Sequence, residues 1–481
     1  MVDKVKKIEL VFIPSPGIGH IVSMVQMAKL IVARDPRLSI TVLVIKRPGA
    51  TAAVNIVELV PVDQTRIRFL HLREPDPVSI IHLNAGDRFF ASIGELQLPI
   101  VREAIAAEVL GRPGSGNLAG LIIDMFCACM VDVAKEFHVP SYIYFPCNAA
   151  SLGQMYHMKA LRDEHGTDGS EFMNSDVLLD IPFFSHPYPA KVLPTVSIDE
   201  ALGSTTFLNL TKKFNESNGI VINTFAELES RAIRVISEIE KFPPVYSVGP
   251  ILNHEKSVGE EHDEIMRWLD GQPPSSVVYL CFGSMGTFGE AQVKEIAMAL
   301  EKSRHRFLWS LRLPPSIKVP ITEVLPEGFL ERTGDVGKLV GWTPQVEVLS
   351  HNAVGGFVSH CGWNSTLESL WCGVPVAAWP MFAEQQLNAF LLVKELELAV
   401  EVKMEFRQNP FSVNVDDIVA ASVIEGAIRR LMDVNEMRKK VKDMSQMSRK
   451  AVMEGGSSYV SLGRFIEDVI HNAHCGDLSE D

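Results

Sequence analysis

The chain has 481 residues, of which 47% are apolar and 22% are charged, the composition of an ordinary globular protein. This length exceeds the size at which a single hydrophobic core stops growing, so we expect two domains. The formal net charge of -14 argues against a broad surface for polyanions, and nucleic acid is therefore not an expected partner.

The first apolar run, residues 8–14, follows several basic residues, as the core of a signal peptide would. It is interrupted at once by Ser15, Pro16 and Gly17 and has no small-residue cleavage site, so we interpret it as a buried first strand. No uncharged apolar stretch reaches the roughly 18 residues that a membrane helix needs. We expect a cytoplasmic protein that does not insert into a membrane.

Short apolar runs alternate with helical patterns along most of the chain, which is typical of parallel sheets covered by helices. One series of predicted strands comprises residues 8–14, 40–45, 118–124 and 141–146. A second series comprises residues 277–282, 306–311, 338–342, 355–360 and 374–380.

These patterns predict an α/β fold with two doubly wound, Rossmann-like domains that face a cleft. The N-terminal domain comprises residues 1–248, a polar and aperiodic linker 249–264, and the C-terminal domain 265–455. Residues 456–481 contain a last helix that could pack back on the N-terminal domain. Its Val460, Phe465 and Val469 lie near one stripe, and its end is expected to fray.

The loop PSPGIGH, residues 14–20, lies where a dinucleotide-binding fingerprint would lie. A GxGxxG motif that began at Gly17 would need glycine at position 22, where the chain has Val22. Lys46 and Arg47 stand where an NAD site has an acidic residue, and they would suit a 2′-phosphate. An NADP-dependent reductase therefore remains an alternative.

The loop also carries His20, at the carboxyl end of the first predicted strand. A histidine at a helix start can be a simple capping or packing residue, but imidazole titrates near neutral pH and suits a general base. Asp124 ends another predicted strand, where a buried carboxylate is costly unless it is paired. The two side chains could meet at one sheet edge as a base and the carboxylate that orients it.

Residues 355–373 predict a buried strand, a tight turn and a short helix that ends at Gly373. Asn364 and Ser365 place capping side chains and free backbone N–H groups at the start of this helix, a site suited to phosphate. No Lys or Arg occurs between positions 342 and 393, so neutral donors, the helix dipole and His360 would have to hold such a phosphate.

The segment from Trp342 to Gln385 resembles the signature box of plant family 1 UDP-glycosyltransferases, which have the GT-B fold. The likeness extends to SPGIGH near the start, FGSMGTF at 282–288 and GGSS at 455–458. The resemblance implies transfer of glucose from UDP-glucose to a hydroxyl of a small hydrophobic plant metabolite, a flavonoid or another phenolic. The reaction would invert the anomeric centre and give a β-O-glucoside.

Other features of the activity also follow from the resemblance or remain open. No Asp-x-Asp sequence occurs, so we expect neither a metal requirement nor another cofactor. The partners would be UDP-glucose and the small-molecule acceptor, and the protein is expected to be a monomer. A terpenoid, triterpenoid or hormone-like acceptor is an alternative, as is a sugar-nucleotide binding protein that does no chemistry.

The resemblance assigns roles to individual residues. His20 would be the catalytic base and Asp124 the carboxylate that orients it. Trp342 would stack on the uracil, Gln345 would contact the nucleoside, and Glu368 would accept the ribose hydroxyls.

The remaining roles concern the diphosphate, the sugar and the acceptor. The diphosphate would be held by Ser284, His360, Asn364 and Ser365. The sugar hydroxyls would be bound by Trp363, Glu384 and Gln385, where much of the family has aspartate in place of Glu384 and Gln385 resembles the glucose users. From the aromatic residues of the N-terminal domain we also expect an apolar acceptor pocket. Its candidates are Phe90, Phe126, Phe145 and Phe184.

Overall fold

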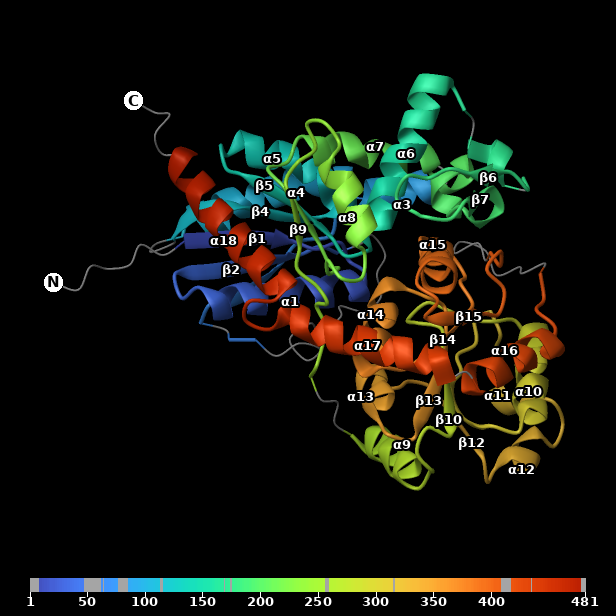
Figure 1. Ribbon diagram of the computed structural model, residues 1–481. Helices are drawn as coiled ribbons and strands as arrows, with labels where there is room; N and C mark the ends of the chain where they lie inside the picture. The colour runs from blue at the N-terminus through green and yellow to red at the C-terminus, as the bar shows by residue number, and fades with distance from the viewer. Residues whose placement is uncertain are drawn as a thin grey trace.

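The structure is a computed structural model. It describes residues 8–46, 62–63, 65–76, 85–112, 116–167, 169–173, 175–255, 259–314, 316–407, 417–433 and 435–476. Within this part, two large parallel sheets lie in two lobes, one at the upper left and one at the lower right of Figure 1.

The N-terminal sheet has the strand order β3-β2-β1-β4-β5-β8-β9, and all its pairs are parallel. Its strands are β1 (Ile8–Ile13), β2 (Leu38–Val44), β3 (Ile67–His71), β4 (Asn117–Asp124), β5 (Ser141–Phe145), β8 (Ile220–Ile222) and β9 (Val245–Ser247). The helices of this lobe are α1 (Ile18–Arg34), α3 (Ala85–Ile93), α4 (Leu98–Ala104), α5 (Val131–Glu136), α6 (Ala149–His165), α7 (Ser204–Asn215) and α8 (Ser230–Ser237). A small antiparallel hairpin pairs β6 (Leu178–Leu179) with β7 (Tyr188–Pro189).

The C-terminal sheet has the order β12-β11-β10-β13-β14-β15, again with every pair parallel. Its strands are β10 (Val277–Cys281), β11 (Arg306–Ser310), β12 (Gly337–Val340), β13 (Val354–Ser359), β14 (Val376–Ala378) and β15 (Ala399–Glu401). Its helices are α9 (Glu260–Asp270), α10 (Glu290–Ser303), α11 (Ile321–Val324), α12 (Phe329–Thr333), α13 (Gln345–Ser350), α14 (Trp363–Cys372), α15 (Gln385–Phe390), α16 (Ala421–Asp433) and α17 (Asn435–Val452).

Both sheets have the order of a doubly wound Rossmann-like fold, which confirms the predicted fold class. All nine predicted strands are present, within a few residues of their expected bounds. In the two large sheets, four described strands were not predicted: β3, β8, β9 and β15. Three of these have only three residues each, and β3 is largely half-buried, so none produces a long apolar run.

The last helix, α18 (Ser457–Gly476), leaves the C-terminal lobe and packs on strands β4 and β9 of the N-terminal sheet. Figure 1 shows α17 and α18 running one after the other across the boundary between the lobes. Phe465 and Val469 are buried as expected, but the prediction for Val460 was wrong, since half of its surface is exposed. Leu462 and Ile466 complete the buried stripe, because they lie three or four positions from the other members.

The predicted linker, residues 249–264, is not irregular throughout its described part. Helix α9 already begins at Glu260, because acidic side chains in its first turn favour a helix N-terminus and Ile265 and Leu269 are buried one turn apart. Residues just after Gly249 also pack inward, and the backbone N–H of Ile251 donates to Asn223 Oδ1 over 2.7 Å. Among its described residues, 251–255 lie outside helices and strands, as a linker would.

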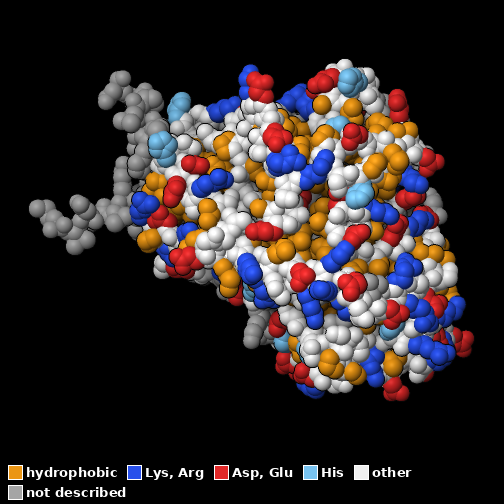
Figure 2. Space-filling view, viewed as in Figure 1, with side chains coloured by type: hydrophobic (Ala, Val, Ile, Leu, Met, Phe, Trp, Pro, Cys, Tyr) orange, Lys and Arg blue, Asp and Glu red, His pale blue; other side chains and the backbone are white. Residues whose placement is uncertain are grey.

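On the face shown in Figure 2, basic side chains are interspersed with acidic ones. A mixed surface of this kind offers no extended positive patch to a polyanion on that face. Among the described residues, no helix is long and apolar enough to cross a membrane.

Candidate functional site

The strand order reverses once in each sheet, and candidate site residues flank both reversals. In the N-terminal sheet, His20 lies in the first turn of α1, just after β1, and Asp124 is the last residue of the neighbouring β4. In the C-terminal sheet, Ser284 follows β10 and His360 follows the neighbouring β13. Open α/β sheets bind ligands at such reversals, so the topology alone marks both places as binding positions.

Residues from the two reversals meet across the domain boundary. The side-chain amide of Asn364, in the first turn of α14, donates to the backbone oxygen of Gly19 over 3.2 Å. Gly19 directly precedes His20. The loop that carries His20 and the helix that carries the phosphate candidates therefore belong to one composite site.

His20 and Asp124 form the hydrogen bond that the sequence suggested, with 2.7 Å between Nδ1 and Oδ2. Asp124 is fully buried, and its other oxygen accepts from the backbone N–H of Phe126 over 3.0 Å. Because an ionised carboxylate can only accept, Nδ1 carries the proton and Nε2 keeps a free lone pair. Nε2 is thus available as a base in a side chain that is 23% exposed.

The pKa of His20 reflects competing effects. Burial lowers this pKa, but the charge and hydrogen bond of Asp124 raise it, and the charge of Glu384 adds to the rise. The net result is a pKa above the ordinary 6.5. A raised pKa makes this imidazole a stronger proton acceptor, as a general base requires.

Two nucleoside candidates lie together, Gln345 at the start of α13 and Glu368 on α14, and Trp342 lies in the loop before α13. Gln345 Nε2 donates to Glu368 over 2.6 Å and to Ser365 Oγ over 2.7 Å. Burial raises the pKa of Glu368 to about 7, although the hydrogen bond from Gln345 opposes this rise. Trp342 is 55% exposed, which leaves its ring free to stack.

The phosphate candidates combine a neutral histidine with unpartnered polar atoms. Burial, and then the positive charge of Arg312, lower the pKa of His360 to about 4, so its imidazole is neutral at physiological pH. Among the described residues, the buried atoms His360 Nδ1 and Asn364 Oδ1 have no hydrogen-bond partner. Gly283 has a φ of 72°, and a Cβ there would lie 2.4 Å from His360 Nε2, so only glycine fits this turn.

The sugar candidates are more constrained than the sequence suggested. Burial raises the pKa of Glu384, whose carboxylate accepts from Asn388 Nδ2 over 3.3 Å. Gln385 uses its Oε1 to accept from the backbone N–H groups of Met381 and Phe382, over 2.9 and 3.1 Å. Only the amide nitrogen of Gln385 is left to contact a sugar.

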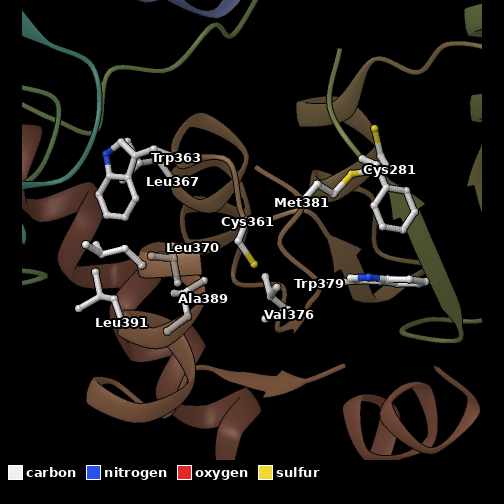
Figure 3. Close-up of a cluster of buried hydrophobic side chains, with 14 of the residues drawn as sticks. Cys281, Cys361, Trp363, Leu367, Leu370, Val376, Trp379, Met381, Ala389 and Leu391 are labelled. Atoms are coloured by element: carbon white, nitrogen blue, oxygen red, sulfur yellow. The ribbon is translucent and has the colours of Figure 1, made fainter. Parts of the chain in front are cut away.

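Trp363, which was predicted to bind the sugar hydroxyls, has a buried ring. Trp363 is 3% exposed, and its indole N–H donates to the backbone oxygen of Asn223 over 2.7 Å. Figure 3 shows the ring beside Leu367, within the cluster of buried apolar side chains. Trp363 therefore ties the two domains together, and what it can offer the site is its backbone.

Two of the four acceptor-pocket candidates are also core residues. Phe145 is 1% exposed and packs edge-on against Phe214. Phe184 is 2% exposed and packs between Tyr188 and Phe390. Their apolar surface is already buried against protein, so neither lines an acceptor pocket here.

The other two candidates lie near His20. The ring of Phe126 is half-buried, with its centroid 5.1 Å from that of His20. Phe90 lies behind it, 5.8 Å away and only 7% exposed. Phe126 is therefore the candidate that can contact a molecule placed at the base.

Arg312 was not singled out from the sequence. It follows β11 by two residues and donates to the backbone oxygens of Gly283 and Ser284, the latter over 2.7 Å. The rule that strand carboxyl ends line the site would have pointed to it, since RFLWSL was a predicted strand.

The described residues contain no group of three His, Cys, Asp or Glu side chains placed to hold a metal ion.

We expect Asp124→Asn to lower the pKa of His20, because the neutral amide no longer stabilises the imidazolium. An NMR pH titration of the histidine rings in the full chain measures this shift. The matched control is Asp270→Asn, which removes an exposed carboxylate from His351, 3.1 Å away, and should leave His20 unchanged. An unchanged or higher His20 pKa in Asp124→Asn would show that the carboxylate does not control the base.

Comparisons with known proteins agree with this geometry. The family model described as "UDP-glucoronosyl and UDP-glucosyl transferase" matches residues 207–451. UDP-glycosyltransferase 71A15 of Malus domestica is 51% identical, over 96% of this chain and 99% of that protein. UDP-glucose flavonoid 3-O-glucosyltransferase 6 of Fragaria ananassa is 49% identical, over 96% and 99%.

A solved structure extends the comparison to the fold. Medicago truncatula UGT71G1, complexed with UDP-glucose, superposes with a TM-score of 0.85 at 40% identity and covers 98% of this chain and 100% of that one. Likeness at this identity over nearly the whole length excludes the alternative that the chain is an NADP-dependent reductase. The chain belongs to the UDP-glucoronosyl and UDP-glucosyl transferase family, and it is a glycosyltransferase of the GT-B fold.

Proposed function

We propose that this enzyme transfers glucose from UDP-glucose to a hydroxyl group of a small aromatic metabolite and forms a β-O-glucoside. The observation that carries the proposal is the 2.7 Å hydrogen bond from His20 Nδ1 to buried Asp124, which leaves Nε2 free beside the domain boundary. The donor is supported by the Medicago truncatula relative, whose structure contains UDP-glucose, and by the Fragaria ananassa relative named for this donor.

The reaction is a single displacement that inverts the anomeric carbon. His20 Nε2 takes the proton of the acceptor hydroxyl while the oxygen forms a bond to that carbon. The bond from the same carbon to the diphosphate oxygen breaks on the opposite face, and UDP leaves with the electron pair. Asp124 stabilises the imidazolium that results, and the α-linked glucose becomes β-linked.

The aromatic acceptor is supported by the surroundings of the base. Phe126 presents a half-buried ring at 36° to the imidazole plane, and its own neighbours Phe89 and Phe90 are aromatic. A flat apolar surface beside a base suits a planar phenolic molecule, because ring contacts orient it while its hydroxyl faces the imidazole. The relative from Fragaria ananassa is named for flavonoids, which belong to this class.

The direct test measures UDP release from UDP-glucose with a panel of flavonoids, simple phenols and terpenoid alcohols. We expect release to depend on an added phenolic acceptor and to persist in excess EDTA, because the proposal includes no metal. Product NMR should show a β-linked glucoside. Release without an acceptor, a preference for terpenoid alcohols, or activity restored only by Mn²⁺ would each contradict the corresponding part of the proposal.

His20→Ala should lower kcat by at least about 100-fold, the usual effect of losing a general base. Its UDP-glucose affinity should be retained, because His20 is proposed to act on the acceptor. The control is His262→Ala. His262 lies near the start of α9 and is paired with Asp263 and Glu347, so its removal should leave kcat unchanged. A near wild-type kcat in His20→Ala would exclude the proposed base.

The affinity for UDP-glucose should fall as the pH drops. Because the pKa of free Glu368 is about 7, its carboxylate is partly protonated at neutral pH, whereas two ribose hydroxyls need the ionised form as acceptor. Binding therefore releases a proton, and affinity should fall by about tenfold from pH 8 to pH 6. Calorimetric titrations across this range measure the effect.

The matched variants for this experiment are Glu368→Gln and Glu323→Gln. The first should bind more weakly and without the pH dependence, because an amide does not titrate in this range. Glu323 is an exposed residue of α11, and its replacement should keep the wild-type profile. A flat profile in the wild-type enzyme would mean that Glu368 does not ionise on binding.

A further inference from the structure

The segment that would hold the donor diphosphate carries no positively charged side chain. UDP-glucose brings a doubly charged diphosphate, and the residues from 342 to 393 include no Lys or Arg. His360 is neutral because its pKa is lowered to about 4. Taking a diphosphate out of water without a nearby positive charge is costly, so a cation from another part of the fold is expected.

Arg312 is a half-buried cation close to this site. It lies two residues beyond β11, the strand beside β10, and so reaches the turn that follows β10. Its guanidinium donates to the backbone oxygen of Ser284 over 2.7 Å and also to that of Gly283. Among the described residues, no carboxylate forms an ion pair with Arg312, so its charge is not neutralised locally.

The two hydrogen bonds also fix the direction of two amide groups. In a planar trans peptide, the N–H points away from the C=O of the same unit. Because the oxygens of Gly283 and Ser284 face Arg312, the N–H groups of Ser284 and Met285 point to the other side. Neither N–H donates to an acceptor among the described residues. Successive free N–H groups beside a left-handed residue, here Gly283, are a known form of anion-binding nest.

The same turn touches His360. The hypothetical Cβ of Gly283 would lie 2.4 Å from His360 Nε2, so backbone and imidazole are in direct contact. The positive charge of Arg312 contributes to the lowered pKa of His360, which places the guanidinium within electrostatic reach of that ring. Arg312, the turn and His360 therefore form one polar cluster at the reversal of the C-terminal sheet.

We propose that Arg312 is a positioning residue for the donor diphosphate: its guanidinium clamps the Gly283–Ser284 turn so that two backbone N–H groups face the diphosphate, and its charge strengthens their hold. This inference rests on the proposed binding of UDP-glucose at this site. Arginine suits the role because its planar fork engages two oxygens at once, whereas lysine supplies a charge without that geometry.

The test compares the affinities of UDP and uridine, by calorimetry, for the wild type, Arg312→Gln, Arg312→Lys and Arg306→Gln. Arg306 is the matched control, because it lies at the opposite end of β11 and bonds to Gln272. Arg312→Gln should weaken UDP binding by about tenfold and leave uridine binding unchanged. Arg312→Lys should recover part of the loss, and Arg306→Gln should bind both ligands as the wild type does.

A second readout needs no ligand. An NMR titration should show the pKa of His360 rising toward its ordinary 6.5 in Arg312→Gln, because a nearby positive charge has been removed. The pKa should stay low in Arg306→Gln. A rise confined to Arg312→Gln would assign the effect to this guanidinium rather than to the loss of any arginine of β11 or its end.

Several results would overturn the inference. They are wild-type UDP affinity in Arg312→Gln, an equal loss of UDP and uridine binding, a lysine variant no better than the glutamine variant, or an unchanged His360 pKa. The experiment uses no acceptor, so it is independent of the acceptor class. If the wild type itself failed to bind UDP, the proposed donor would fall together with this inference.

Discussion

The buried carboxylate of Asp124 is the constraint on which the catalytic half of the site depends. A fully buried charge is tolerated only when its oxygens are hydrogen-bonded, and here one oxygen accepts from His20 and the other from the Phe126 backbone. The same contacts decide the tautomer of the base and place the Phe126 ring beside it. The need to hydrogen-bond the buried carboxylate therefore determines the orientation of His20, the nitrogen that carries its proton and the position of the Phe126 ring.

Polar contacts between the domains help to hold the two halves in register, beside apolar ones such as that of Phe184 with Phe390. Asn148, at the start of α6, donates to Asn388 on α15 over 2.5 Å. Glu395 accepts from Ser185 Oγ over 2.6 Å. The indole of Trp363 closes the set through Asn223. The Asn148–Asn388 and Trp363–Asn223 contacts are buried, so losing either partner would leave a polar group without its hydrogen bond inside the interface.

The sequence was sufficient for the fold and for the pairing of His20 with Asp124, because both residues adjoin long apolar strands whose carboxyl ends must share a sheet edge. It was not sufficient where burial depends on tertiary packing. Every residue of β5 is buried, so nothing in the alternation of Ser141–Phe145 tells whether Phe145 faces a pocket or the core. The partner of the Trp363 indole is a backbone oxygen 140 positions away, which leaves no local signal.

Arg312 shows a different limit of sequence reasoning. No Lys or Arg occurs in the segment from 342 to 393, whereas Arg312 lies just beyond β11 and bonds to the turn that carries Ser284. Neighbouring strands in a doubly wound sheet are separated in sequence by a helix, so residues that share a site are often some thirty positions apart, here 28 between Ser284 and Arg312.

The path of the chain between the lobes has a mechanical consequence. The chain passes from the N-terminal lobe to the C-terminal lobe after Gly249 and returns at the start of α18, and these two passages touch, since Ser458 Oγ donates to the oxygen of Gly249 over 2.5 Å. The two passages of the chain between the lobes are thus held together at one point. Because the two passages are joined there, sliding or twisting of one lobe against the other is restrained, and this favours the contact of Asn364 with the carbonyl of Gly19.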